Sequence, residues 1–167
     1  MLADHLMETQ FCGVSGNTII DAVATLRDII AYEESRIPLR VFSLDFKYVF
    51  NSIAHNYLFQ TLQGYGIANA FIKRMYEGAT SSVQINGHQY GPIPIRCVVR
   101  QWCPMSMAVY TMCLHQFLRL LDLKLPGIRI GRRTRTTSVV AYADGVTIFV
   151  TSAADFTIRE EAIRLYE

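Results

Sequence analysis

Residues 139–150 read VVAYADGVTIFV, two apolar runs separated by Ala143, Asp144 and Gly145. Runs this rich in valine, isoleucine and aromatic side chains favour β-strands, and a glycine between two such runs indicates a turn. The stretch therefore predicts a β-hairpin, with one strand on each side of these three residues.

The rest of the chain predicts helices mixed with further extended segments. Thr18 followed by Asp21 resembles a capping box at a helix start, and Asn86-Gly87 is the strongest short hairpin signal. The patterns predict helices at residues 18–33, 52–64, 69–76, 104–123 and from about 155, and strands at 39–46, 82–85 and 90–95. No regular β–α–β rhythm connects these elements, so the predicted class is α+β, with a mostly antiparallel sheet packed on helices.

Composition and charge exclude several classes of protein. Of the residues, 51% are apolar and 18% are charged, which is typical of a globular core and not of a disordered or collagen-like chain. No apolar run approaches the roughly 18 residues of a membrane span, and the N-terminus lacks the pattern of a secretion signal. We expect an intracellular protein without a membrane partner, and the sequence does not distinguish nucleus from cytoplasm.

The cysteines and the basic residues give weaker indications. The four cysteines lack the spacings of a zinc site or a disulfide scaffold, so we expect buried thiols and no disulfide-linked partner. A net charge of +2 is too small to indicate a nucleic-acid binder. Thirteen of the sixteen basic residues are arginine, however, and arginine suits contacts with phosphate better than lysine does.

Two aspartates occupy unusual positions in apolar strands. Asp45 nearly ends the run 39–46, where alternation places it on one face with Val41 and Ser43, and Asp144 lies in the hairpin. If the two strands are neighbours, the two carboxylates could hold Mg²⁺, which suits sparse carboxylate sites and assists phosphoryl transfer. The alternative is simple hydration, because Asp-Gly is a good two-residue hairpin turn and an aspartate at a strand end is often only solvated.

Three motifs follow one another in the order of a known family. They are LDFKYVFN at residues 44–51, RQWCPMS at residues 100–106 and YADG at residues 142–145. In this order and spacing they resemble the palm motifs of reverse transcriptases from non-LTR retrotransposons, the long interspersed elements. The segments at 10–13, 82–87 and 127–131 also resemble that family, so the resemblance covers nearly the whole chain.

The resemblance implies an RNA-directed DNA polymerase that joins a primer 3′-hydroxyl to a nucleoside triphosphate, assisted by two Mg²⁺ or Mn²⁺ ions. Asp45 and Asp144 match the catalytic, metal-binding aspartates. Phe50 matches the side chain that crowds the nucleotide's 2′-hydroxyl, and Gln101, with the neighbouring Arg100, matches the nucleotide pocket. An RNA template and a DNA primer are the implied partners.

A basic run precedes the hairpin. It consists of Arg129, Arg132, Arg133 and Arg135. One interpretation is phosphate contact along the path of template and primer, and the other is a solvated loop.

Three positions depart from the family's motifs. Gly145 replaces the second aspartate of the Tyr-Ala-Asp-Asp box, Trp102 replaces a glycine beside the nucleotide pocket, and Asn51 replaces an acid. The indole of Trp102 should intrude on that pocket. If the first two changes each cost about 2–4 kcal/mol, the rate falls about a thousandfold or more.

The resemblance further predicts an incomplete domain. Residues 1–167 match a single partial reverse transcriptase domain, with a fingers-side segment at about 1–38, a palm at about 39–167 and no thumb. We expect a descendant of a retrotransposon polymerase in which catalysis is impaired or lost. One alternative is a non-catalytic remnant that binds RNA or DNA through Arg100, Arg129, Arg132, Arg133 and Arg135. The other is a fragment prone to unfolding because apolar palm surface lies exposed. The sequence leaves the oligomeric state open.

Overall fold

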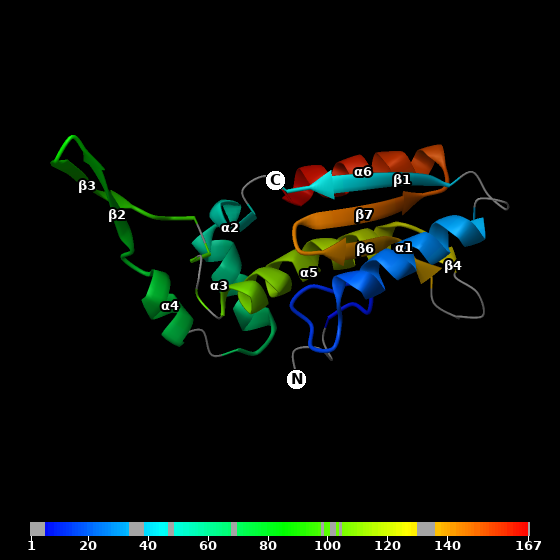
Figure 1. The fold of residues 1–167 in the computed structure, drawn as a ribbon, viewed down its shortest axis with the longest axis horizontal. Helices are drawn as coiled ribbons and strands as arrows, with labels where there is room; N and C mark the ends of the chain where they lie inside the picture. Colours follow the sequence, from blue (N-terminus) through cyan, green and yellow to red (C-terminus); the bar gives the residue numbers. More distant parts are fainter. Residues whose placement is uncertain are drawn as a thin grey trace. The chain divides into compact units, whose positions relative to one another are not determined.

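The chain folds into two compact units. The computed structural model describes residues 6–33, 39–46, 49–67, 70–97, 99–100, 103, 105–129 and 136–166. The first unit combines Met1–Lys47 with Leu114–Glu167, and the second consists of Tyr48–Cys113 (Figure 1). The structure combines α-helices with antiparallel pairs of strands. This confirms the predicted α+β class.

The first unit holds the larger sheet. Its elements are α1 (Ile19–Glu33), β1 (Arg40–Asp45), the C-terminal part of α5 (Ser106–Lys124), β4 (Ile128–Arg129), β5 (Thr136–Thr137), β6 (Val139–Tyr142), β7 (Gly145–Val150) and α6 (Ala153–Tyr166). The second unit holds α2 (Val49–Ser52), α3 (His55–Gly64), α4 (Ala70–Tyr76), β2 (Thr80–Ile85), β3 (His88–Pro94) and the N-terminal part of α5.

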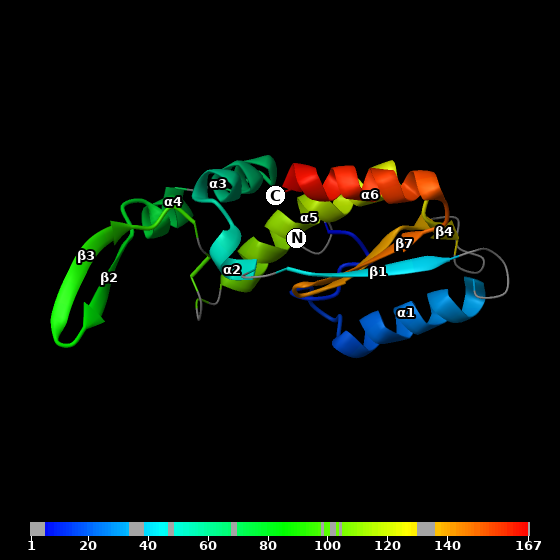
Figure 2. The same ribbon diagram turned by 90° about the horizontal axis from the view of Figure 1, so that it is seen from above.

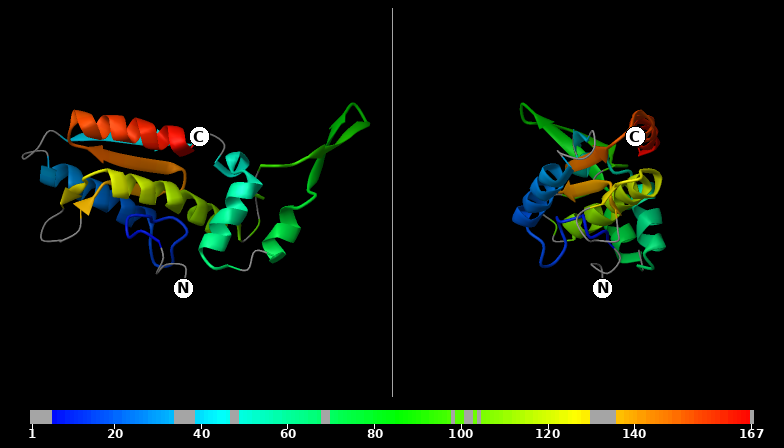
Figure 3. Two further views of the ribbon diagram at one scale, coloured as in Figure 1. Left: turned by 180° about the vertical axis from the view of Figure 1, so that it is seen from behind. Right: turned by 90° about the vertical axis from the view of Figure 1, so that its right-hand side faces the viewer.

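The main sheet has the strand order β1-β7-β6, and both strand pairs are antiparallel. Helix α1 covers one face of this sheet, and α6 with the C-terminal part of α5 covers the other, as Figure 2 and the end-on view in Figure 3 show. Because both faces meet helices, the central strand β7 is almost entirely apolar, and Phe149 is only 1% exposed.

Short polar motifs fix where the two outer helices begin. At α1 the Thr18 N–H donates to Asp21 Oδ2 at 2.8 Å, and the Asp21 N–H donates to Thr18 Oγ1 at 3.3 Å. At α6 the Ser152 N–H donates to Asp155 Oδ2 at 2.9 Å, and the Asp155 N–H donates to Ser152 Oγ at 3.2 Å. These reciprocal bonds satisfy amides that a helix start leaves open, and they confirm the predicted capping box at Thr18.

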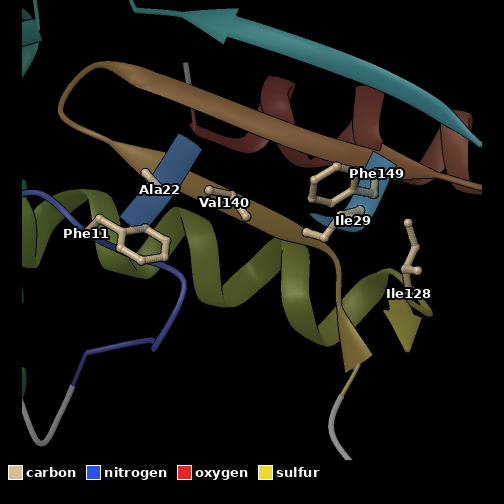
Figure 4. Packing of buried hydrophobic residues seen from close by; sticks show 6 residues of the cluster. All are labelled: Phe11, Ala22, Ile29, Ile128, Val140 and Phe149. Carbon is tan, nitrogen blue, oxygen red and sulfur yellow. The ribbon is translucent and has the colours of Figure 1, made fainter. Parts of the chain in front are cut away.

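A cluster of buried apolar side chains joins α1 to the sheet (Figure 4). Its members come from the N-terminal segment, α1, β4, β6 and β7, and they are Phe11, Ala22, Ile29, Ile128, Val140 and Phe149. Apart from the small Ala22, burying each of these side chains stabilises the fold by about 1.5–3 kcal/mol. The cluster therefore anchors the N-terminal segment beside β6, the strand that leads into the turn with Asp144.

The second unit projects a two-stranded hairpin. Strands β2 and β3 pair on either side of Asn86 and Gly87, whose φ angles are +51° and +82°. Two successive positive φ angles are the requirement of the type I′ turn that Asn-Gly favours, so the predicted hairpin is confirmed. Every residue of both strands is exposed.

The cysteines correct one expectation. Only Cys113 is buried; Cys97 is exposed, and Cys12 and Cys103 are half-buried. The prediction of four buried thiols was therefore wrong for three of them. Burial raises the pKa of the Cys113 thiol to about 12, although a hydrogen bond with the Thr61 side chain acts in the opposite direction.

Over the ranges that the structure describes, no helix combines the length and the apolar character needed to cross a membrane.

Candidate functional site

Asp45 is the last residue of strand β1. Along this strand Val41, Ser43 and Asp45 are exposed, whereas Phe42 and Leu44 are half-buried, which confirms the predicted alternation of faces. The Phe42 ring packs edge-on against Phe156 of α6 with ring centres 5.4 Å apart. Phe42 therefore projects from the face of the sheet that α6 covers. Asp45 projects from the opposite face, because successive residues of a strand alternate between faces.

Asp144 lies in the turn between β6 and β7. The strand register pairs Tyr142 with Gly145, so the two turn residues are Ala143 and Asp144. The interpretation of Asp144-Gly145 as the two-residue turn is therefore wrong. Gly145 is the first residue of β7, and the positive φ of the turn, +52°, falls on Ala143.

The register brings the two aspartates to the same end of the sheet. Asp45 is paired with Gly145, the residue next to Asp144, and the Phe46 N–H donates to the Asp144 carbonyl oxygen at 3.4 Å. Residues facing each other in an antiparallel pair have Cα atoms about 4.5–5.5 Å apart, and consecutive Cα atoms are about 3.8 Å apart. The Cα atoms of Asp45 and Asp144 consequently lie within about 9 Å of each other.

The donors at this end of the sheet are carboxylate oxygens. Asp45 and Asp144 are both exposed, so their carboxylates are accessible to an ion from solvent. Among the residues described, no group of three or more His, Cys, Asp or Glu side chains is placed so that it could hold a metal ion. Two exposed carboxylates fit Mg²⁺, which usually binds through one or two carboxylates and keeps water or phosphate oxygens as its other ligands.

Gly145 lies in one row with Asp45 and Tyr142 across the three strands. Residues that face each other in neighbouring strands project to the same side, so a side chain at position 145 would share the face of Asp45. A Cβ atom built on Gly145 meets only the Tyr142 carbonyl oxygen, at an ordinary 3.4 Å. The fold therefore has room for a Cβ atom at this position.

Cys12 lies against the Ala143-Asp144 turn, and the sequence patterns gave no sign of this contact. Burial raises the pKa of the Cys12 thiol, a hydrogen bond with the Ala143 backbone lowers it, and the nearby Asp144 charge raises it. Cys12 and Asp144 are more than a hundred positions apart in the sequence. The pairing of the N-terminal segment with β6 brings them together.

Two further predicted residues, Phe50 and Arg100, belong to the second unit. The Phe50 ring is half-buried and packs against Tyr110 with ring centres 5.3 Å apart. Arg100 is exposed; its N–H donates to the Tyr76 hydroxyl at 3.2 Å, and its carbonyl oxygen accepts a hydrogen bond from the Ser106 hydroxyl. The Arg100 backbone is thus fixed while its guanidinium remains accessible.

The remaining predicted residues lie largely outside the described part of the chain. Arg129 ends strand β4, but only its backbone is described. Outside the described residues lie Gln101, Trp102, Arg132, Arg133 and Arg135.

Comparisons with known proteins agree on one family. A family model described as "Reverse transcriptase (RNA-dependent DNA polymerase)" matches residues 6–165. The chain is 31% identical over 170 residues to the "Transposon TX1 uncharacterized 149 kDa protein" of Xenopus laevis, a match that covers 99% of this chain and 13% of that protein.

A second relative is consistent with this family, and a solved structure shows a similar fold. Over 110 residues the chain is 26% identical to the "Retrovirus-related Pol polyprotein from type-2 retrotransposable element R2DM" of Drosophila melanogaster, covering 64% of this chain and 10% of that protein. The fold is similar to that of an apo telomerase from Candida tropicalis truncated from its C-terminal domain, with a TM-score of 0.50 and 10% identity, covering 93% of this chain and 32% of the telomerase chain. The chain thus spans only a small part of the curated relatives that it matches. The family model over residues 6–165 and the 31% identity to the Xenopus laevis protein show that the chain belongs to the reverse transcriptase family.

Proposed function

We propose that this chain is a reverse transcriptase-like domain in which Asp45 and Asp144 hold divalent cations, Mg²⁺ or Mn²⁺, for nucleotidyl transfer. The pairing of Asp45 with Gly145, the neighbour of Asp144, is the observation that carries the proposal. The reaction is attack of a DNA primer 3′-hydroxyl on a nucleoside triphosphate, directed by an RNA template. When bound, the cations would stabilise the charge that develops on the transferred phosphoryl group.

The other side chains have supporting roles in this proposal. Phe50 would crowd the 2′-hydroxyl of a ribonucleotide, and Gln101 with Arg100 would contact the incoming nucleotide. The half-buried ring of Phe50 against Tyr110 gives it a fixed position within its unit, as a steric filter requires. The exposed guanidinium of Arg100 presents donors suited to phosphate oxygens.

We further propose that nucleotidyl transfer is impaired in this chain. Gly145 removes one carboxylate from the row that contains Asp45, although a Cβ atom at this position has only an ordinary contact. The change therefore removes one negative charge near the proposed cations. Trp102, in place of a glycine, adds a bulky indole to the segment of the proposed nucleotide pocket.

Primer extension on an RNA template with Mg²⁺ or Mn²⁺ tests both parts of the proposal. We expect no incorporation by the natural chain, and we expect incorporation to appear when Gly145→Asp and Trp102→Gly are introduced together within a full-length reverse transcriptase. Adding Asp45→Asn to that variant should abolish the incorporation again. The matched control is Gly145→Asn with Trp102→Gly, which has the same size at position 145 but no added charge.

Each outcome of this experiment has a definite meaning. Synthesis by the natural chain that disappears in Asp45→Asn would support the catalytic assignment and contradict the impairment. A doubly restored variant that stays inactive, but binds Mn²⁺ through Asp45, would show that these two positions are not what limits catalysis. Mn²⁺ binding that is unaffected by Asp45→Asn would contradict the metal site itself.

A second candidate function is binding of RNA or DNA without catalysis, and the charges of the second unit favour it. Residues 48–113 contain four Lys or Arg residues and one acid, Glu77, whereas the first unit contains twelve basic and thirteen acidic residues. The four basic side chains are exposed, and they are Lys73, Arg74, Arg96 and Arg100. Exposed cations with few neighbouring acids are the usual basis of affinity for a phosphate backbone.

A further inference from the structure

The N-terminal segment lies beside strand β6 as an additional, parallel partner. The Phe11 N–H donates to the Ala141 carbonyl oxygen at 2.9 Å, and the Ala141 N–H donates to the Thr9 carbonyl oxygen at 2.9 Å. The Phe11 side chain is 8% exposed and belongs to the core cluster of Figure 4. Because the two segments run parallel, the next residue of the N-terminal segment, Cys12, is carried toward the turn that follows β6.

The turn at Ala143 and Asp144 is held from two sides. On the β1 side, the Phe46 N–H donates to the Asp144 carbonyl oxygen at 3.4 Å. On the side of the N-terminal segment, Cys12 makes a hydrogen bond with the Ala143 backbone. A cysteine sulfur is a weak acceptor, and the Ala143 N–H is the backbone donor available at that residue.

The conformation of Ala143 explains why such support matters. Its φ of +52° lies in the left-handed region, where a residue with a Cβ atom has a higher free energy. Contacts with neighbouring residues must offset this cost. Without a bond at the Ala143 N–H, the turn could relax toward a less strained backbone. The carboxylate of the next residue, Asp144, would then change direction.

We propose that Cys12 is a positioning residue for Asp144: its sulfur accepts the Ala143 N–H hydrogen bond and thereby fixes the turn that directs the Asp144 carboxylate. The consequence for cation binding rests on the proposed function, because it assumes that Asp144 is a metal ligand. The consequence for the turn itself does not depend on that function.

The test compares Cys12→Ala, which removes the acceptor, with Cys12→Ser, which retains one. We expect Cys12→Ala to accelerate hydrogen exchange of the Ala143 amide about 3- to 10-fold, as measured by NMR, and to weaken Mn²⁺ binding by a similar factor, as measured by electron paramagnetic resonance. Cys12→Ser should restore both quantities at least in part. The Ile148 amide, in the middle of β7, should exchange at the natural rate in both variants, which separates a local effect from general destabilisation.

Cys97→Ala is the matched control, since Cys97 is exposed and belongs to the other unit. It should leave the Ala143 amide and Mn²⁺ binding unchanged. The inference is overturned if Cys12→Ala leaves Ala143 exchange at the natural rate, or if Cys12→Ser behaves like Cys12→Ala. If the natural chain binds no Mn²⁺ at all, the proposed function fails, and Ala143 exchange still decides whether Cys12 supports the turn.

Discussion

At the scale of single residues, the turn that presents Asp144 depends on Ala143. A left-handed φ of +52° costs an alanine about 1–2 kcal/mol, whereas a glycine adopts it without that cost. We expect Ala143→Gly to change the free energy of unfolding by less than about 1 kcal/mol, because relief of strain offsets the greater entropy of the unfolded chain. Ala143→Val should destabilise the chain by about 1–3 kcal/mol, since a β-branched residue tolerates this conformation poorly. Urea denaturation measures both values, and equal stability of the two variants would contradict the strained turn.

The glycine at position 145 gives a second prediction at this scale. Gly145→Asp should fold, because a Cβ atom there has an ordinary 3.4 Å contact with the Tyr142 carbonyl oxygen. The new carboxylate would face Asp45 directly, and like charges that face each other across strands are destabilising by about 0.2–1 kcal/mol. We therefore expect a small fall in Tm that addition of Mn²⁺ reverses. Gly145→Asn is the uncharged control; an equal response of its Tm to Mn²⁺ would exclude a charge effect.

At the scale of elements, the start of α6 depends on one carboxylate. Burial by itself would raise the pKa of Asp155, which is 5% exposed, but hydrogen bonds from Ser152 and Thr151 outweigh it, and the pKa lies below its ordinary value. A lowered pKa means that the unfolded chain takes up the proton first as pH falls. This contribution to stability is complete above about pH 4, the ordinary range of the unfolded carboxyl group, and is lost as pH falls through the lower folded pKa.

Asp155→Asn tests this dependence on pH. The variant should be less stable than the natural chain at neutral pH, and its free energy of unfolding should fall less steeply below about pH 4. Asp28→Asn is the matched control, because the ion pair of Asp28 with Arg27 is exposed and such a pair is worth about 0–1 kcal/mol. Urea denaturation from pH 7 to pH 3 makes the comparison. Parallel curves for the natural chain and Asp155→Asn would contradict the proposed role of the carboxylate.

Local signals account for most of the elements that the sequence predicts. The capping box at Thr18 places the start of α1 to within a residue, and Asn86-Gly87 places the β2–β3 turn, because both act through neighbours in the chain. The short helix α2 was not predicted. The β6–β7 hairpin was predicted around Ala143, Asp144 and Gly145, whereas the turn consists of Ala143 and Asp144. The preference of Asp-Gly for turns pointed to Asp144-Gly145, but pairing with β1 draws Gly145 into β7.

The candidate site was predictable only in part for the same reason. The two aspartates stand out in the sequence because one ends an apolar run and the other lies between two apolar runs, and their common sheet end followed from the family's motifs. The contact of Cys12 with the turn depends on a parallel pairing between two segments that lie more than a hundred residues apart in the sequence. The periodicity of the sequence gives no indication of such a pairing. Hydrogen bonds of this kind depend on the tertiary structure and not on the local pattern.

At the scale of the whole molecule, the charges are divided unequally between the two units. We expect fluorescence anisotropy to show binding of a single-stranded oligonucleotide that weakens as salt increases. Replacing Lys73 and Arg74 together by alanine should weaken binding and reduce the slope of log K against log[salt] by about 1–2, since each lost phosphate contact accounts for about 0.7–0.9. Arg27→Ala, at an exposed position of the first unit, is the control and should change the slope little. If the double substitution leaves the slope of log K against log[salt] unchanged, Lys73 and Arg74 are not part of the binding surface.

The exposed hairpin has a practical consequence for work with this protein in concentrated solution. Strands β2 and β3 form a sheet of two strands, so each has one edge that no other strand of that sheet occupies. Pro92 and Pro94 lack an N–H and weaken the β3 edge as a template, whereas β2 carries exposed Val83 and Ile85 and contains no proline. Molecules should therefore adhere to one another first along β2, and Val83→Lys should raise the concentration at which the solution becomes turbid.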